Sequence, residues 1–212
     1  MKTFYNEQFK SVDFTQEDLV KNEYDCCEFS DCQFNETLLT STVFLDCSFT
    51  DCDFSLAKIN VTSFKNAVFN GCKMIGLEFN NCNPFLLELA FEKCILNYSS
   101  FYQLNLKEVL FNQCKLENVD FTETNLTKAK LMECDLTGAV FSNSNLTKAD
   151  LRTVVNLSLD PEKNTLTEAL FSKESAEVGS SLVFGQRGHE IKTVVVSAVV
   201  KEHFVFSAGH QV

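Results

Sequence analysis

A five-residue period in large apolar side chains constrains the fold of this chain more than any other feature of its sequence. Counted from Phe4, every fifth residue is large and apolar as far as Phe79. The step then slips by two residues within Asn80–Phe85, resumes at Leu86 and continues to Leu151. Thirty consecutive positions obey this rule and carry 16 of the 21 Phe, in a chain with 45% hydrophobic residues. Chance gives such a run about once in 10^10 sequences, so the repeat is real.

A period of five matches neither the helical period of about 3.6 nor the strand period of about 2. A side chain that faces inward at every fifth position requires a chain that turns a corner every five residues. Four such sides close a square coil of about 20 residues, and successive coils stack at the strand spacing of about 4.8 Å. We therefore predict an all-β solenoid of about seven coils and about 36 Å length.

The position two residues before each apolar centre supports this geometry because it is mostly small. Only a little volume remains beside a large central residue where the chain bends inward. Examples are Cys27, Thr37, Thr42, Ala57, Ala67, Ala129 and Ala149.

The resulting motif of small, polar, Leu or Phe, polar and variable residues resembles the pentapeptide-repeat proteins. Clean examples are Ala129-Lys130-Leu131-Met132-Glu133 and Ala139-Val140-Phe141-Ser142-Asn143. The resemblance covers about residues 4–155 and implies a right-handed quadrilateral β-helix with a non-repeat C-terminal segment. We expect the β-helix to span 1–156, and 157–212 to form the array exit and a C-terminal cap, dimer contact or tail.

Six of the ten cysteines are spaced by one coil, with a 22-residue step where the phase slips. They are Cys32, Cys52, Cys72, Cys94, Cys114 and Cys134. We interpret them as reduced thiols that fill one interior column as small apolar groups. A disulfide or a metal site is the alternative, but parallel stacked side chains suit a disulfide poorly and the chain has no Cys-x-x-Cys pair. We predict no metal and no cofactor.

The charge of the chain is strongly negative and unevenly distributed. The net charge is −11, and residues 1–60 contain 12 acids and four bases. This balance argues against direct binding of nucleic acid through a basic patch. If three coils occupy about 14 Å, the N-terminal part carries about one net charge per 1.8 Å, close to the value of about 1.7 Å for duplex DNA. The candidate partner-binding residues are Glu23, Asp25, Glu28, Asp31, Asp46, Asp51 and Asp53.

Several other function classes find no support in the sequence. It contains no nucleophile–base pair, no phosphate-binding Gly loop and no metal-ligand cluster, so we predict no catalytic residue and no enzyme activity. The sequence has no run of 18 or more apolar residues, so we predict no membrane span. The first residues lack an apolar signal core, so we expect a cytoplasmic protein.

Two segments interrupt or follow the repeat. Asn83-Pro84-Phe85 breaks the five-residue step, and we interpret it as a local bulge, with a small protrusion that touches a partner as the sharper alternative. In residues 173–212, a helical stripe is fitted by Ile191, Val194, Val195, Ala198 and Val199, whereas the Val runs favour a strand. The segment is a candidate cap, homodimer contact or tail.

The Leu159-Asp160-Pro161 segment is similar to the array exit of the quinolone-resistance and microcin-immunity branch of the family. That resemblance implies a mimic of duplex DNA that binds DNA gyrase or topoisomerase IV and protects it from quinolone-like or peptide inhibitors. The alternative is a protein-interaction scaffold with another partner, whose acidic exterior serves solubility alone.

Overall fold

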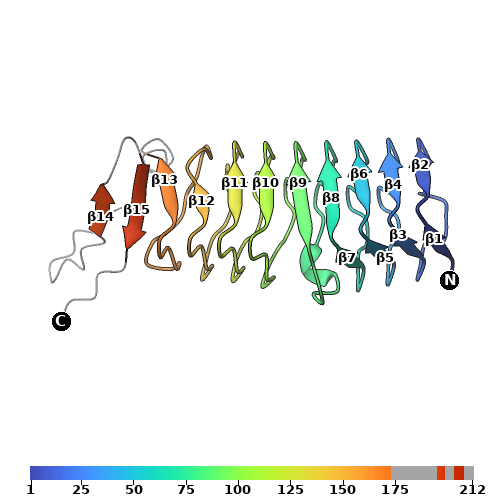
Figure 1. Ribbon diagram of the computed structural model, residues 1–212, viewed down its shortest axis with the longest axis horizontal. Helices are drawn as coiled ribbons and strands as arrows, with labels where there is room; N and C mark the ends of the chain where they lie inside the picture. The colour runs from blue at the N-terminus through green and yellow to red at the C-terminus, as the bar shows by residue number, and fades with distance from the viewer. Residues whose placement is uncertain (173–194, 199–202, 208–212) are drawn as a thin grey trace.

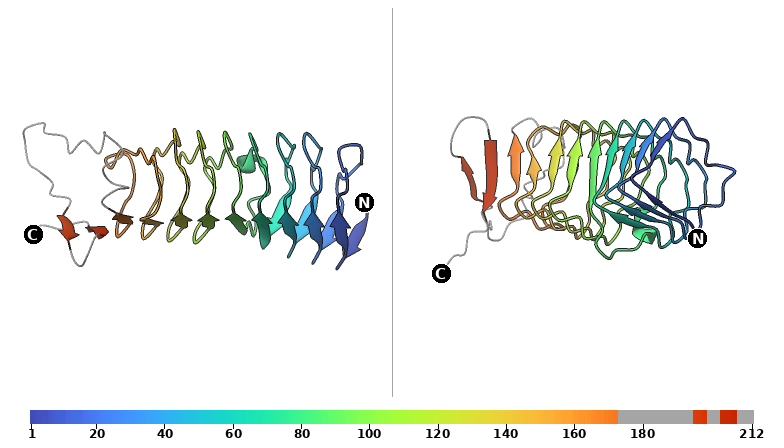
Figure 2. Two further views of the ribbon diagram at one scale, coloured as in Figure 1. Left: turned by 90° about the horizontal axis from the view of Figure 1, so that it is seen from above. Right: turned by 45° about the vertical axis from the view of Figure 1, so that its right-hand side comes forward.

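The computed structural model describes residues 1–172, 195–198 and 203–207 and shows a β-solenoid of about eight turns (Figure 1). The coils stack along one axis from the N-terminal to the C-terminal end (Figure 2). The one helix among the described residues is the three-residue 3-10 helix η1 (Phe79–Asn81), far too short to span a membrane. These findings confirm the predicted all-β solenoid.

Two of the four sides form parallel sheets, one over the first four coils and one along the whole shaft. The first side consists of β1 (Thr3–Tyr5), β3 (Glu23–Asp25), β5 (Val43–Leu45) and β7 (Ser63–Lys65). The second side runs the length of the shaft as β2 (Gln8–Lys10), β4 (Glu28–Ser30), β6 (Ser48–Thr50), β8 (Ala67–Asn70), β9 (Leu89–Glu92), β10 (Leu110–Asn112), β11 (Lys130–Met132), β12 (Asp150–Leu151) and β13 (Leu170–Ser172).

The third and fourth sides are held by single bridges between coils. Gln33 pairs with Asp53 on the third side, and Leu38 pairs with Lys58 on the fourth. Bridged partners lie 20 residues apart, except across the phase slip, where Phe69 pairs with Phe91, Lys73 with Ile95 and Glu78 with Ser100. This 20-residue pairing continues past residue 156 as far as Leu151 with Phe171.

The core is a set of aromatic and aliphatic columns that follow the coil axis. Parallel rings of successive coils stack at centroid distances from 4.5 Å, between Phe34 and Phe54, to 5.5 Å, between Phe69 and Phe91. Consecutive centres of one coil meet edge to face, as Phe49 and Phe54 do at 5.2 Å. Both are favourable aromatic geometries, so each ring contacts neighbours within and between coils.

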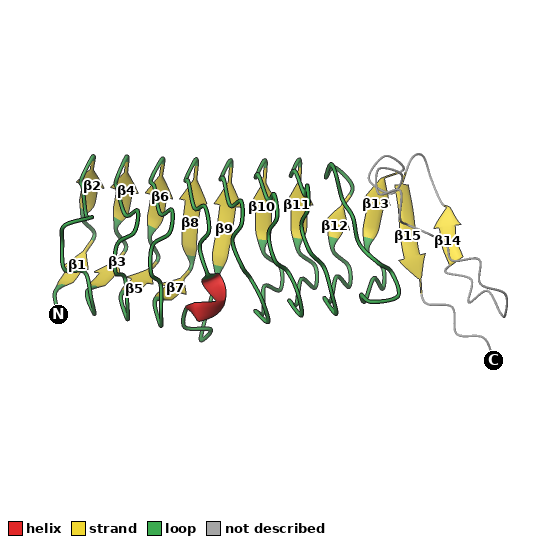
Figure 3. Cartoon of the chain, turned by 180° about the vertical axis from the view of Figure 1, so that it is seen from behind, coloured by secondary structure: helices red, strands yellow, loops and turns green. Residues whose placement is uncertain are grey.

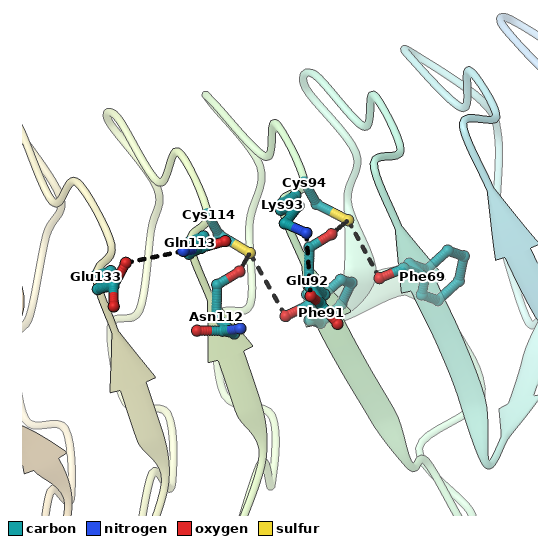
Figure 4. Close-up of polar contacts among 9 residues, drawn as sticks. All are labelled: Phe69, Phe91, Glu92, Lys93, Cys94, Asn112, Gln113, Cys114 and Glu133. Atoms are coloured by element: carbon teal, nitrogen blue, oxygen red, sulfur yellow. Dashed lines mark hydrogen bonds and ion pairs between the residues drawn. The ribbon is translucent and has the colours of Figure 1, made fainter.

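The cysteine column forms as the sequence predicts. All ten cysteines are free thiols, and all but Cys26 are buried. Each thiol of the column donates a hydrogen bond to a backbone carbonyl of the preceding coil, as Cys94 does to Phe69 at 3.4 Å and Cys114 to Phe91 at 3.6 Å (Figure 4). Thr42 and Ser144 make the same bond from other columns. The small position therefore carries a hydrogen-bond donor that ties adjacent coils together.

These thiols provide a direct test of the interior column. Burial raises the pKa of Cys32 in the column, and it raises the pKa of two other interior thiols, Cys47 and Cys82, to about 12. We expect a thiol reagent to label about one cysteine, Cys26, in the native chain at neutral pH, because Cys26 is the one thiol that is not buried and buried thiols are inert. Labelling of all ten should follow the addition of denaturant. Fast labelling of several thiols under native conditions would contradict the column.

The corners are made by residues in the left-handed region, two positions after each centre. Asp31, Asp51 and Val61 have φ values of 54°, 53° and 58°. Such a conformation is unfavourable for residues other than Gly, and most of all for a β-branched one. The repeat imposes it regardless of residue type, so Val61 holds backbone strain.

We therefore expect Val61→Gly to raise the free energy of unfolding by about 0.5–1 kcal/mol, because relief of strain outweighs the added entropy of the unfolded chain. The control is Val140→Gly: Val140 is similarly exposed (50%, against 59% for Val61) but bridges to Asp120 and lies outside the left-handed set. That change should destabilise the protein. Urea unfolding measures both, and equal effects would contradict the strain at the corner.

The expected resumption of the period at Leu86 is wrong by one residue. Leu86 is 55% exposed with a φ of 55°, and Leu87 packs against the core instead. The extra residues between η1 and β9 are taken up by a loop, so the apolar centre on the first side shifts along the chain. From Phe91 onward the predicted centres are buried as expected.

Beyond the repeat, the last coil pairs with two antiparallel strands. β13 pairs with β15 (His203–Ser207), and β15 pairs with β14 (Val195–Ala198). Where the sequence left helix and strand open, the described residues are strands. Ile191, Val194 and Val199 lie outside the described residues, and a homodimer through this segment stays a prediction.

Candidate partner-binding surface

The seven predicted acidic residues lie on three adjoining sides of the second and third coils. Glu23 and Asp25 are on β3 of the first side, and Glu28 is on β4 of the second. Asp53 is on the third side. We call these residues, with the three described next, the acidic surface.

The other three carboxylates are at corners. Asp46 occupies a left-handed position between the first and second sides, and Asp31 and Asp51 stack one coil apart between the second and third. A corner residue projects away from the shaft, so all three are exposed. Lys58, the one base within residues 23–60, lies on the fourth side. Glu36 is at the corner between the third and fourth sides, so only the fourth side itself carries no acid in these two coils.

Among the described residues, only Asp53 of the acidic surface forms an ion pair, with Lys73 at 3.3 Å. Its partial burial raises the pKa of Asp53, but hydrogen bonds from Ser55 and Lys73 outweigh that effect and hold it below the usual value. The other six carboxylates have no ion-pair partner within the described chain.

The C-terminal half of the shaft differs in this respect. Lys128 contacts Glu108 at 3.0 Å, and its hydrogen bond lowers the pKa of that carboxyl. Lys148 pairs with Glu168 at 3.5 Å, and Arg152 with Asp150 at 2.6 Å. Five of the eleven acids between residues 92 and 168 therefore form ion pairs, against one of the eight acids in the second and third coils.

Asp25, Cys26 and Asp46 form the one group within the described residues whose ligand atoms could meet around a metal, all within 4.8 Å of one another. The Cys26 thiol donates to Asp25 at 3.2 Å, and this hydrogen bond raises the pKa of the thiol. Asn66 donates to Asp46 at 2.7 Å. Neighbouring polar groups thus already satisfy these atoms, and we assign no metal to them.

Asn83, Pro84 and Phe85 form a loop that leaves the shaft after η1, where the sheet of the first side ends at β7 (Figure 3). The Asn83 amide nitrogen donates to Ser63 at 3.0 Å, and Asn83 accepts a bond from the Phe85 backbone at 3.0 Å. The loop is thus fixed on β7, and the Phe85 side chain is 68% exposed. The loop is a local bulge that presents an aromatic ring, and its contact with a partner stays a prediction.

The loop and part of the acidic surface share the first side of the shaft. From β3, which carries Glu23 and Asp25, the order is β5, then β7, then Asn83 stacked on Ser63. The three strand spacings from β3 to Asn83 amount to about 14 Å.

Corner spacing could have identified the exposed carboxylates, because Asp31, Asp46 and Asp51 each follow a centre by two residues.

The different packing of Leu86, which is exposed, and Leu87, which contacts the core, gives a testable contrast. We expect Leu87→Ala to lower the free energy of unfolding by about 1–2 kcal/mol, because it removes apolar contacts with the core. Leu86→Ala should change it by less than about 0.5 kcal/mol, since Leu86 is exposed. Chemical denaturation of both variants is the measurement. A larger loss of stability for Leu86→Ala than for Leu87→Ala would show that Leu86, as the five-residue period predicts, is the residue packed in the core.

Comparison with known proteins addresses the fold. The model of the pentapeptide repeat region family matches residues 42–116 and 86–159. A trypsin-treated variant of QnrB1, a plasmid-mediated fluoroquinolone resistance protein, has a similar structure, with 21% identity and a TM-score of 0.51 over 82% of this chain and 91% of that one. HetL, involved in heterocyst differentiation regulation in the cyanobacterium Nostoc sp. strain PCC 7120, also has a similar structure. Its sequence identity is 15% and its TM-score 0.52, over 82% of this chain and 92% of that one. No curated protein sequence matches the chain.

Proposed function

Because this chain belongs to the pentapeptide-repeat family, we propose that it is a non-enzymatic protein that binds a protein partner through its acidic surface. The partner we propose is a bacterial type II topoisomerase, DNA gyrase or topoisomerase IV, at the surface where that enzyme holds duplex DNA. In this proposal the acidic surface imitates the DNA. Its binding protects the enzyme from quinolone-like or peptide inhibitors by displacing DNA or the inhibitor-trapped complex.

The observation that carries the proposal is the set of unpaired carboxylates on adjoining sides of the second and third coils. Six of the seven have no ion-pair partner among the described residues, whereas five of the eleven acids between residues 92 and 168 pair with Lys or Arg. An unneutralised row of charge is what a phosphate-binding surface recognises, and its density over residues 1–60 is close to that of duplex DNA.

The shape of the shaft supports the same proposal. The carboxylates are carried on short strands and corners whose backbone is hydrogen-bonded between coils: the Asp31 amide donates to the Thr50 carbonyl, and the Asp51 amide to the Asn70 carbonyl, of the next coil. A pre-ordered charged surface loses little conformational entropy on binding. Phe85 would add an apolar contact at the end of the first side, since exposed aromatic rings are frequent anchors in protein interfaces.

The similarity to QnrB1 is consistent with this function, but the fold alone does not select it. HetL has a TM-score as high as that of QnrB1 and is involved in a different process. That observation favours the second candidate, an interaction scaffold with a partner other than a topoisomerase. The two candidates differ in whether the acidic surface is used.

Neutralising Glu28, Asp31, Asp51 and Asp53 together, as Glu28→Gln, Asp31→Asn, Asp51→Asn and Asp53→Asn, should abolish binding to purified gyrase. Removal of several charges from an electrostatic interface lowers both the association rate and the affinity. Asp53→Asn alone should have the smallest effect of the four, because Lys73 already neutralises that carboxylate. Surface plasmon resonance at two salt concentrations measures the affinities, and binding of the unaltered chain should weaken with salt.

A matched control neutralises four acids of the C-terminal half: Glu117→Gln, Glu123→Gln, Glu133→Gln and Glu162→Gln. It changes the net charge equally and should retain most of the affinity. Equal losses in the two variants would show a general charge effect, and unchanged binding of the first variant would exclude the acidic surface as the site.

Gyrase supercoiling with and without ciprofloxacin separates the two candidate functions. We expect the unaltered chain to preserve supercoiling in the presence of the drug and the four-fold N-terminal variant to lose this protection. If the chain changes neither supercoiling nor drug inhibition at micromolar concentration, the topoisomerase proposal fails and the scaffold remains.

A further inference from the structure

The outer edge of the first coil is an open template for strand pairing. In the second coil, the backbone amides of Glu23, Glu28 and Gln33 donate to carbonyls of the first coil at 2.9 Å. The amides of Thr3, Gln8 and Asp13 hold the same place one coil earlier, where the described residues provide no coil to accept their bonds. β1 and β2 are accordingly the terminal strands of the two sheets.

Apolar surface accompanies this open edge. Phe4, Phe9 and Val12 are only partly buried, although they pack against the core. Phe4 stacks on Tyr24 and Phe9 on Phe29, both at 4.9 Å, and no ring of the described residues stacks on their outer faces. Unpaired edges next to apolar surface favour the addition of a strand from another chain.

Three of the four residues at the inward small position of this coil are charged, unlike Val12 and the residues that follow in these columns. Lys2 precedes Asn22 and Thr42, Glu7 precedes Cys27 and Cys47, and Glu17 precedes Thr37 and Ala57 in the same columns. The later members are all buried, whereas Lys2, Glu7 and Glu17 are exposed. A coil stacked on this end would cover three charged groups in a space that elsewhere holds small uncharged ones.

Two more features oppose pairing at this end. Lys10 lies on the edge strand β2, and both edge strands are three residues long. Charged and short edge strands are the means by which natural sheets avoid edge-to-edge association, and solenoids need polar terminal repeats for the same reason. The burial of an uncompensated charge is unfavourable, so these groups exclude a further coil.

We propose that the first coil is a charged end cap, in which Lys2, Glu7 and Glu17 prevent a second copy of this chain from pairing with β1 and β2. The cap acts on self-association only. It is independent of the acidic surface of the second and third coils and of any topoisomerase.

The test replaces each charged residue by an uncharged one found later in its own column, as Lys2→Asn, Glu7→Ala and Glu17→Thr. We expect this triple variant to associate about tenfold or more tightly than the unaltered chain, because the open edges and apolar rings become accessible. Sedimentation velocity over a concentration series measures the change. Association through the C-terminal segment is common to both proteins and cancels in the comparison.

A control variant carries the same change of charge on the shaft, as Lys58→Asn, Glu88→Ala and Glu162→Thr, and should sediment like the unaltered chain. The single substitution Glu7→Ala, at an exposed position, tests the cap even if the triple variant misfolds, and should increase association to a smaller extent. If the folded triple and single variants both sediment like the unaltered chain, or the control associates equally, the cap is excluded.

Discussion

The structure depends on the stacking of one large apolar side chain per five residues on its counterpart in the next coil. The strand spacing and the preferred distance between stacked rings are nearly equal, so backbone pairing and ring stacking reinforce each other. Phe29 and Phe49, for instance, stack at 4.9 Å while their strands pair residue by residue. The hydrogen bonds from the small position, such as Cys52 to the Phe29 carbonyl at 3.6 Å, join the same two coils.

This interior repeat determines what the exterior presents. Because each side advances by one strand per coil, residues 20 apart form outward columns, and side-chain contacts along them recur, as in Gln103 to Glu123 and Asn125 to Asn105. Corner positions project furthest. An acidic residue at a corner, such as Asp31 or Asp51, therefore carries its charge away from the shaft, and the sequence of the corners sets the electrostatic surface.

Much of the fold was predictable from the sequence because a strict period requires a strict geometry. The centres, the interior thiols and the place of the irregularity near Pro84 all follow from counting. The identity of Leu87 as the packed residue did not, since a two-residue slip does not say which residues the loop takes up. Ion pairs were also beyond the sequence: that Lys73 neutralises Asp53 depends on both side chains lying in one column and reaching each other. The partner is not encoded in the repeat at all, because the same scaffold serves different processes.

The central claim is that the acidic second and third coils occupy the site of duplex DNA on a topoisomerase. Equilibrium competition tests it most directly, with a fluorescent DNA duplex bound to gyrase and the chain added at increasing concentration. The account predicts that the apparent Kd of the DNA rises in proportion to the concentration of the chain, with no ternary complex. Bound DNA that is not displaced, or a complex that contains gyrase, DNA and the chain together, would contradict it.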